Sequence, residues 1–256
     1  MAVEEITDLF ARTLLGDYED DTPWDAVLAL RRMGNRDVLQ QAAEWIESAD
    51  PLKRARALEV VAQLGKTVEH PSNTFPQESY ELVVTALGRE RALLPLRSAI
   101  AALGYLGDAR AVRLVAAFFS DPSAEIRFSV ACALGSFLSD PLSVKTLLAL
   151  MEDQDGDIRD WATFAVGVLS DQDSVDLRDS LYRRLEDSHP EAAEEAVVGL
   201  AKRHDLRVLP KLIELLTGTS SSRAVEAARM LLGLNDDNEE RAGSDYANML
   251  RRQFNR

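Results

Sequence analysis

An apolar residue followed by glycine or alanine recurs near the end of seven amphipathic helical patterns, and this repeat constrains the fold more than any other feature. The pairs are Met33-Gly34, Leu64-Gly65, Leu103-Gly104, Leu134-Gly135, Val166-Gly167, Leu200-Ala201 and Leu232-Gly233. Successive pairs are 31, 39, 31, 32, 34 and 32 residues apart. A period of this length is typical of arrays in which one helical unit stacks on the next.

Each unit has the pattern of a helical hairpin. Before each of the later pairs, small and apolar residues are spaced i, i+4, i+7, i+8, which places them in one stripe on a helix. Examples of the stripe are Ile126, Val130, Ala133, Leu134 and Ile158, Ala162, Ala165, Val166. A second amphipathic segment, such as "DPLSVKTLLALM", lies between successive stripes. Because one hairpin cannot bury its apolar faces alone, stacked hairpins are expected to share a continuous core.

Composition favours the same class. Aromatic residues are only 6% of the 256 residues, whereas strands are usually rich in aromatic and β-branched side chains. The predicted fold is therefore an all-α, right-handed α-solenoid of about seven hairpins, forming a single domain over residues 1–256. Residues 1–21 are expected to form an N-terminal capping helix and an acidic loop, residues 22–235 the repeats, and residues 236–256 a C-terminal cap.

Aspartates recur before the predicted helices, where a carboxylate can accept hydrogen bonds from the free backbone amides of a helix start. They are Asp121, Asp153 and Asp187 before the first helix of a hairpin, and Asp108, Asp140 and Asp205 before the second. The stretch "DQDGDIRDWATFAVG", residues 153–167, also has the alternating aspartates of a calcium loop. However, its glycine is at the fourth position instead of the sixth, and Phe164 stands where a glutamate is required. We interpret it as a turn and helix cap.

Units such as "DPSAEIRFSVACALGSFLSDPLSVKTLLALMED" resemble HEAT repeats, especially the short HEAT-like type found in phycobilisome lyase subunits. The resemblance covers roughly residues 22–235, and the first two units fit the pattern less well. It implies a fold more than a function, because such repeats occur in scaffolds, adaptors, transport factors and a few enzymes.

Charge and hydropathy exclude several partners. With 43 acidic and 29 basic residues the formal net charge is -14, which repels nucleic acid. No apolar run approaches the ~20 residues that span a bilayer, and the N-terminus lacks the basic residues of a signal peptide, so no membrane partner and a cytoplasmic location are expected. The local basic groups are interpreted as solvated helix faces: Lys53, Arg54 and Arg56, and Lys202, Arg203, Arg207 and Lys211.

The sequence predicts no catalytic, cofactor-binding or metal-binding residues. The three histidines are scattered, and none is followed by the glutamate of the paired motifs that hold iron in some HEAT-like hydroxylases. Cys132, the single cysteine, lies in an Ala/Leu-rich helical stretch and is interpreted as a structural thiol. Motifs of nucleotide-binding loops and of serine nucleophiles are absent. We therefore expect no enzymatic activity and no cofactor.

Two departures from the repeat stand out as candidate contact sites. Residues 67–79, "TVEHPSNTFPQES", account for the long interval and carry Phe75 in a polar loop, although a tolerated surface insertion explains them equally well. Trp161 occupies the position of Ser129 and Glu195 in the neighbouring units, so its side chain is expected to be partly exposed. Such a residue can anchor a partner or pack against an adjacent helix.

Arg127 and Arg159 align in successive units, and we interpret them as a ladder that pairs with carboxylates between the helices, with partner contact as the alternative. The leading hypothesis is a non-catalytic scaffold or adaptor that binds another protein through the concave helix surface or the 67–79 loop, and the acidity of the chain favours a basic partner. Candidate partner-binding residues are Trp161, Phe75, Arg127 and Arg159. The alternatives are a subunit of a phycobilin-lyase-like enzyme, an antitoxin or immunity-type binding protein, and a purely structural repeat protein, which the irregular intervals disfavour.

Overall fold

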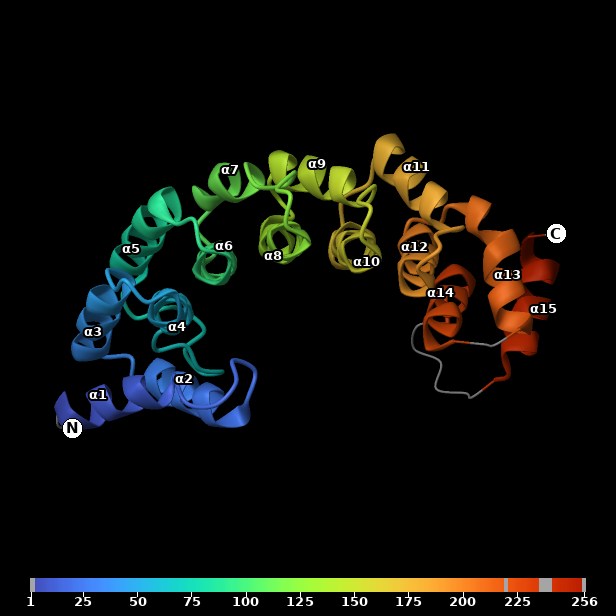
Figure 1. The fold of residues 1–256 in the computed structure, drawn as a ribbon. Coiled ribbons are helices and arrows are strands. Elements are labelled where there is room, and N and C mark those ends of the chain that lie inside the picture. Colours follow the sequence, from blue (N-terminus) through green and yellow to red (C-terminus); the bar gives the residue numbers. More distant parts are fainter. Residues whose placement is uncertain (1–2, 219–220, 235–240, 255–256) are drawn as a thin grey trace. The chain divides into compact units, whose positions relative to one another are not determined.

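A computed structural model gives the structure of residues 3–218, 221–234 and 241–254. Every regular element in these ranges is a helix, and strands are absent from them (Figure 1). The predicted all-α class is confirmed. The chain divides into two compact units, Met1–Phe137 and Leu138–Arg256, which are described separately. A single domain over residues 1–256 stays a prediction.

The first unit is built from two layers of helices (Figure 1). Its elements are α1 (Val3–Arg12), α2 (Asp21–Met33), α3 (Arg36–Ile46), α4 (Pro51–Ala62), α5 (Pro76–Arg89), α6 (Leu93–Leu106), α7 (Ala111–Ala116), α8 (Ala124–Leu134) and the 3-10 helix η1 (Gly135–Phe137). Helix α4 packs between α2 and α6, and α6 packs on α8, so the even-numbered helices form one layer. Helix α3 contacts both α1 and α5 in the other layer. We call these the even-helix and odd-helix layers.

The second unit follows the same plan. Its elements are α9 (Pro141–Leu150), α10 (Gly156–Phe164), the π-helix η2 (Ala165–Leu169), α11 (Val175–Arg184), α12 (Pro190–Lys202), the 3-10 helix η3 (Leu206–Val208), α13 (Leu209–Thr217), α14 (Ser222–Leu232) and α15 (Gly243–Phe254). Helix α12 packs between α10 and α14 in the even-helix layer, and α15 packs on α13 and α14. Residues 236–240 and 255–256 of the predicted C-terminal cap lie outside the described residues.

The repeat frame read from the sequence corresponds to the even-helix layer. All seven apolar-Gly/Ala pairs lie at or near the end of an even-numbered helix. The stripe residues are the core of each unit: Ile126, Val130 and Leu134 on α8, and Ile158 on α10, are at most 1% exposed. Burying an apolar side chain of this size stabilises the fold by about 1.5–3 kcal/mol. Hairpins stacked through such a shared core form an α-solenoid, as predicted.

Gly104 shows why small residues recur in the stripe. A Cβ atom placed on Gly104 of α6 would lie 2.7 Å from the Cα atom of Ala133 on α8. Only a residue without a side chain allows the two helix backbones to approach this closely.

The predicted role of the aspartates needs one correction. Asp140 caps α9 as expected, because its side chain accepts a hydrogen bond from the Leu142 amide at 2.8 Å. Before α8, α10 and α12 the aspartate instead stands two residues ahead of the cap, and it accepts the amide of the N-cap residue. These pairs are Asp121 with Ser123, Asp153 with Asp155, and Asp187 with His189. The reason is that an aspartate favours the turn that leads into a helix as well as the cap itself.

The interpretation of the basic groups as solvated faces is wrong for Arg56 and Arg203. Arg56 is 1% exposed, and Arg203 is 7% exposed. The Arg203 guanidinium donates to the backbone carbonyl oxygens of Val166, Gly167 and Ser170, at 2.7–3.0 Å. These carbonyls lie at the π-helix η2 and just after it, where the last turn leaves acceptors unsatisfied. Burial of Arg203 therefore closes a helix end.

Candidate protein-interaction site

Trp161 lies on α10 in the even-helix layer of the second unit, and it is half-buried. Its ring contacts Phe164 on the same helix, with 5.6 Å between the ring centroids. Ser129 and Glu195, which occupy the same position in the repeat, are only 7% and 9% exposed. The partial exposure expected for Trp161 is confirmed, and contact with a partner stays a prediction.

Arg159, also on α10, forms a rung of the predicted ladder. Its guanidinium makes two hydrogen bonds to the Asp187 carboxylate, Nε to Oδ2 at 2.9 Å and Nη2 to Oδ1 at 2.7 Å. Nη1 donates to the carbonyl oxygens of Asp153 and Gln154. Burial alone would raise the pKa of Asp187, but the hydrogen bonds from Arg159 and from the His189 amide hold it at about 2. The ladder interpretation is confirmed for Arg159.

Arg127 and Arg54 use the same geometry in the first unit. Arg127 is 5% exposed, and its Nη1 donates to the carbonyl oxygens of the turn before α8. Arg54 on α4 does the same with the turn before α4, and its Nε and Nη2 donate to the Glu90 carboxylate at 2.7 and 3.0 Å. Sequence reasoning missed the Arg54–Glu90 rung. The signal available in the sequence was the position of the arginine: Arg54, Arg127 and Arg159 each lie four residues after the N-cap of their helix.

Phe75 lies where the predicted loop ends, and it is half-buried. The Arg36 guanidinium lies over its ring, 4.2 Å from the centroid. The predicted loop of residues 67–79 is shorter than expected, because α5 already begins at Pro76. The buried Asn73 side chain anchors the loop by donating to the Val61 carbonyl at 2.8 Å. The part that faces solvent is therefore residues 67–72, where Val68 is fully exposed.

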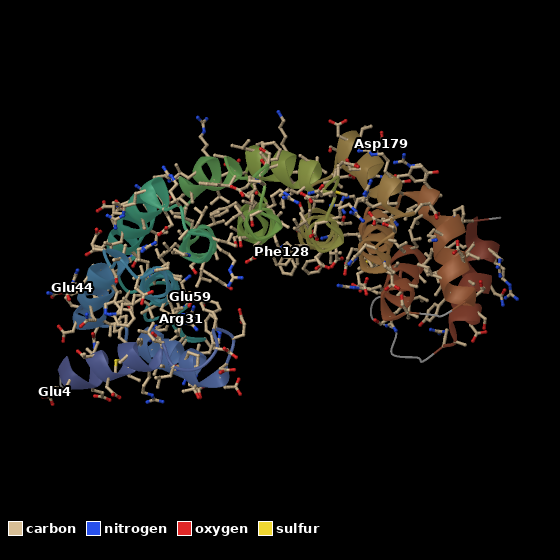
Figure 2. All side chains as sticks on the ribbon, viewed as in Figure 1. Glu4, Arg31, Glu44, Glu59, Phe128 and Asp179 are labelled. Atoms are coloured by element: carbon tan, nitrogen blue, oxygen red, sulfur yellow. The ribbon has the colours of Figure 1, made fainter. Side chains whose placement is uncertain are left out.

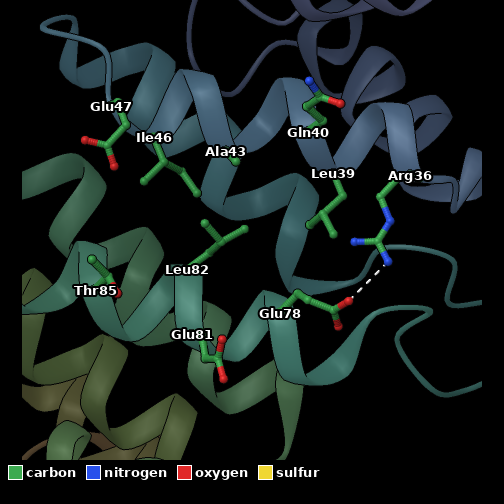
Figure 3. Close-up of a pocket in the computed structure, with 10 residues that line it drawn as sticks. All are labelled: Arg36, Leu39, Gln40, Ala43, Ile46, Glu47, Glu78, Glu81, Leu82 and Thr85. Carbon is green, nitrogen blue, oxygen red and sulfur yellow. Dashed lines mark hydrogen bonds and ion pairs between the residues drawn. The ribbon is translucent and has the colours of Figure 1, made fainter.

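A pocket of about 460 Å³ lies between α3 and α5 in the odd-helix layer (Figure 3). Leu39, Ala43 and Leu82 provide its apolar wall, and an ion pair between Arg36 and Glu78, 3.1 Å long, closes one end. Through Arg36 the pocket adjoins Phe75. The other three predicted site residues do not line it.

Two carboxylates close enough to influence each other, one on α10 and one on α12, were not predicted from the sequence. Asp160 precedes Trp161 on α10, and its Oδ1 atom is buried without a hydrogen-bond partner among the described residues. Glu195 on α12 is 9% exposed. Its Oε1 pairs with Arg223 at 2.7 Å, whereas its Oε2 is buried and unpaired within the part of the chain that the structure describes.

Burial is the main reason why the pKa of both carboxylates is raised. It raises the pKa of Glu195 to about 7, with the nearby Asp160 and Glu226 carboxylates acting in the same direction and Arg223 opposing them. Burial likewise raises the pKa of Asp160. A buried acceptor without a hydrogen bond costs about 1–3 kcal/mol. We call Asp160, Glu195 and Trp161 the acidic site of α10 and α12.

Other reactive groups are accounted for by the fold. Burial raises the pKa of the Cys132 thiol to about 12, so the thiolate that acts as a nucleophile is scarce at neutral pH. His189 lies 3.2 Å from Asp157 across the ends of two neighbouring helices. Within the described ranges, groups of three or more side chains able to hold a metal are absent. Helices long and apolar enough to cross a membrane are also absent from those ranges.

A family model for HEAT repeats matches residues 84–167 and residues 144–233, which together span more than half of the chain. The chain belongs to the HEAT-repeat family. The resemblance seen in the sequence is thereby confirmed, and with it a fold that implies a protein-interaction scaffold.

Among curated proteins, this HEAT-repeat chain is similar to protein YibA of Escherichia coli K12, with 37% identity over 109 residues. The match covers 42% of this chain and 38% of YibA, so it spans less than half of that relative's length. The X-ray structure of YibA aligns with 98% of this chain and 95% of that chain, at a TM-score of 0.74 and 20% identity. This likeness shows the fold alone.

Two further solved structures are more distant. An engineered protein aligns with 98% of this chain and 73% of its own, at a TM-score of 0.60 and 17% identity. The complex of CpcE and CpcF of phycocyanin lyase from Nostoc sp. PCC7120 aligns with 91% of this chain and 83% of its own, at a TM-score of 0.43 and 18% identity. A likeness this weak carries no information about activity, and the lyase-like alternative stays a prediction.

Proposed function

We propose that this HEAT-repeat protein is a non-catalytic scaffold or adaptor that binds a basic segment of another protein through the even-helix layer of its second unit. The observation that carries the proposal is the acidic site of α10 and α12. Asp160 and Glu195 each have a buried carboxylate oxygen without a hydrogen-bond partner among the described residues. Glu195 already pairs with Arg223, so a lysine or arginine side chain from a partner, once it displaces the side chains that cover these two oxygens, would supply the donors that they lack and a counter-charge for Asp160.

Trp161 and Phe164 add a second element of the same site. Aromatic rings attract cations through their faces, and a tryptophan ring is the most effective. In this site the rings lie on the same helix as Asp160. Arg223 of the chain itself already lies over the Phe164 ring, 5.7 Å from its centroid, so the Trp161 ring is the aromatic surface that favours a cationic side chain of a partner over an apolar or an anionic one.

The test is the binding of a fluorescein-labelled peptide of alternating lysine and glycine residues, followed by fluorescence anisotropy. Asp160→Asn and Glu195→Gln are expected to weaken binding about tenfold or more, since one hydrogen bond to a charged group contributes about 1.5–3 kcal/mol. Glu44→Gln is the matched control, because it removes one negative charge at an exposed position of α3. It should change the dissociation constant less than twofold. An equal effect of all three changes would reduce the interaction to net charge and contradict the proposal.

The raised pKa of Glu195 provides a second way to test the same site. Because its pKa is about 7, Glu195 is largely protonated at pH 6 and ionised at pH 8. The peptide should therefore bind more tightly at pH 8 than at pH 6. Glu195→Gln should lose this difference and Glu44→Gln should keep it. The exposed loop of residues 67–72 remains the alternative surface, and Val68→Asp is the change that would weaken binding if the partner contacts the loop instead.

A further inference from the structure

A second polar cavity lies in the even-helix layer of the first unit, where α2, α4 and α6 meet the loop that follows α1. Its volume is about 220 Å³. The side chains that give it its chemistry are Tyr18, Trp24, Arg31, Glu59, Arg97 and Tyr105. None of these residues was singled out from the sequence.

Arg56 forms the buried base of this cavity and fixes the loop against α4. Its Nε donates to the Thr13 carbonyl at 3.0 Å, and its Nη2 donates to the Tyr18 carbonyl at 2.6 Å. Its Nη1 pairs with Glu59 Oε2 at 3.1 Å. The other oxygen of Glu59 accepts from the Tyr18 and Ser98 hydroxyls. The Glu59 carboxylate is thus fully engaged, and its charge is balanced by Arg56.

Arg31 and Arg97 line the same cavity without a strong counter-charge. Arg31 reaches from α2 to α4, where its Nε donates to the backbone carbonyl of Glu59 at 3.0 Å (Figure 2). No carboxylate of the described residues lies within ion-pair distance of Arg31. Arg97 lies over the Tyr18 ring, 5.4 Å from its centroid, and its two ion pairs are long, 3.4 Å to Glu125 and 3.9 Å to Glu19, with both carboxylates more than half exposed. Exposed pairs of this kind contribute at most about 1 kcal/mol.

We propose that this cavity binds a carboxylate of a partner protein, from an acidic side chain or from a C-terminus, between the guanidinium groups of Arg31 and Arg97. Arginine presents its N–H donors in a planar fork that matches a carboxylate. The volume is below the roughly 300–1,000 Å³ of pockets for drug-sized molecules, and suits a single side chain. Trp24 and Tyr105 give the non-polar walls. The proposed function enters only in naming a protein as the carrier of the carboxylate.

The acidity of the whole chain does not oppose this assignment. The charged lining and base comprise three arginines and two glutamates, and with Glu125, which pairs with Arg97, the local charge is even, in contrast to the net negative charge of the whole chain. Charges beyond about 8 Å are largely screened at physiological ionic strength. Burial also lowers the pKa of Arg31, which indicates that its charge is poorly solvated in the absence of an anion.

The experiment follows the Nε–Hε resonances of Arg31 and Arg97 in protein labelled with nitrogen-15 arginine. The probes are N-acetylglutamate α-methylamide, its neutral glutamine counterpart, and N-acetylleucine, which carries only a terminal carboxylate. Saturable shifts with either acid, and at least tenfold weaker binding of the glutamine compound, are expected. The tighter of the two acids identifies the source of the carboxylate. If neither acid binds more tightly than the neutral probe, the proposal is overturned.

Variants separate this site from its surroundings. Arg31→Gln and Arg97→Gln should each weaken binding of the acid about tenfold, as the loss of one charge-assisted contact implies. Arg12→Gln removes one positive charge from an exposed position in the same unit and should leave binding unchanged. Arg97 is 30% exposed, so its variant should fold even if Arg31→Gln does not. Unchanged binding in folded Arg97→Gln would contradict the site. The lysine peptide is proposed to bind the second unit. If that peptide does not bind, the outcome of the carboxylate experiment on the first unit is not affected.

Discussion

Replacing Gly104 by alanine should destabilise the first unit by separating α6 from α8. The added Cβ would lie 2.7 Å from the Ala133 Cα atom and 3.3 Å from its carbonyl oxygen. These are backbone atoms, so no side-chain rotation can relieve the contact. Overpacking of this kind costs about 1–3 kcal/mol, and the better helix propensity of alanine returns about 1 kcal/mol. We expect a net loss of about 1–2 kcal/mol in the free energy of unfolding, because a backbone contact falls at the costly end of this range.

The measurement is urea unfolding followed by tryptophan fluorescence in a Trp161→Phe background, so that only Trp24 and Trp45 of the first unit emit. Gly88→Ala is the matched control. Gly88 lies in α5 with nothing within 4 Å of the added Cβ, and this change should stabilise the unit by about 0.5–1 kcal/mol. Should Gly104→Ala prove as stable as the parent or more so, the close approach of α6 and α8 would not be a constraint on the repeat.

Two further predictions concern the Arg159–Asp187 rung and Cys132. Asp187→Asn should lower the free energy of unfolding by about 2.5 kcal/mol at pH 7, since the pKa of Asp187 lies near 2 in the folded chain and near 3.9 when unfolded. This contribution is complete above about pH 5 and is lost as the pH falls toward 2. The denaturation curves of variant and parent should therefore converge in acid. If the difference in the free energy of unfolding were the same at every pH, the Arg159–Asp187 ion pair would not be its cause. Cys132 should react with iodoacetamide much more slowly in the native chain at pH 8 than in about 8 M urea, which unfolds the chain. Mass spectrometry measures both rates, and equal rates would contradict the raised pKa of Cys132.

The repeat could be predicted from the sequence because its signal is local. Each even-numbered helix carries its own stripe, and residues such as Val130 and Ala162 are buried whichever neighbour packs against them. The helix starts were less predictable, because an aspartate suits both the cap and the turn before it, and Asp153 takes the second role where Asp155 takes the first.

The candidate sites depend on contacts between units of the repeat, which no periodic pattern encodes. Trp161 could be recognised as a departure from the frame. The burial of Glu195 follows from the packing of α10, α12 and α14, and a glutamate in that position is equally compatible with solvent. Arg56 is buried because the loop after α1 folds onto α4 and because Trp24 of α2 lies over its guanidinium. Such folding depends on single hydrogen bonds instead of a repeated pattern.

The arginine rungs have a consequence for how this chain tolerates changes in length. Arg54 reaches a carboxylate 36 residues ahead, whereas Arg159 reaches one 28 residues ahead. The same contact between consecutive turns therefore forms across intervals of different length, with the surplus residues placed outside the stack. Residues 67–72 are such a surplus, and they mark the position at which evolution, or a protein engineer, can lengthen the chain without shifting the register of the hairpins on either side.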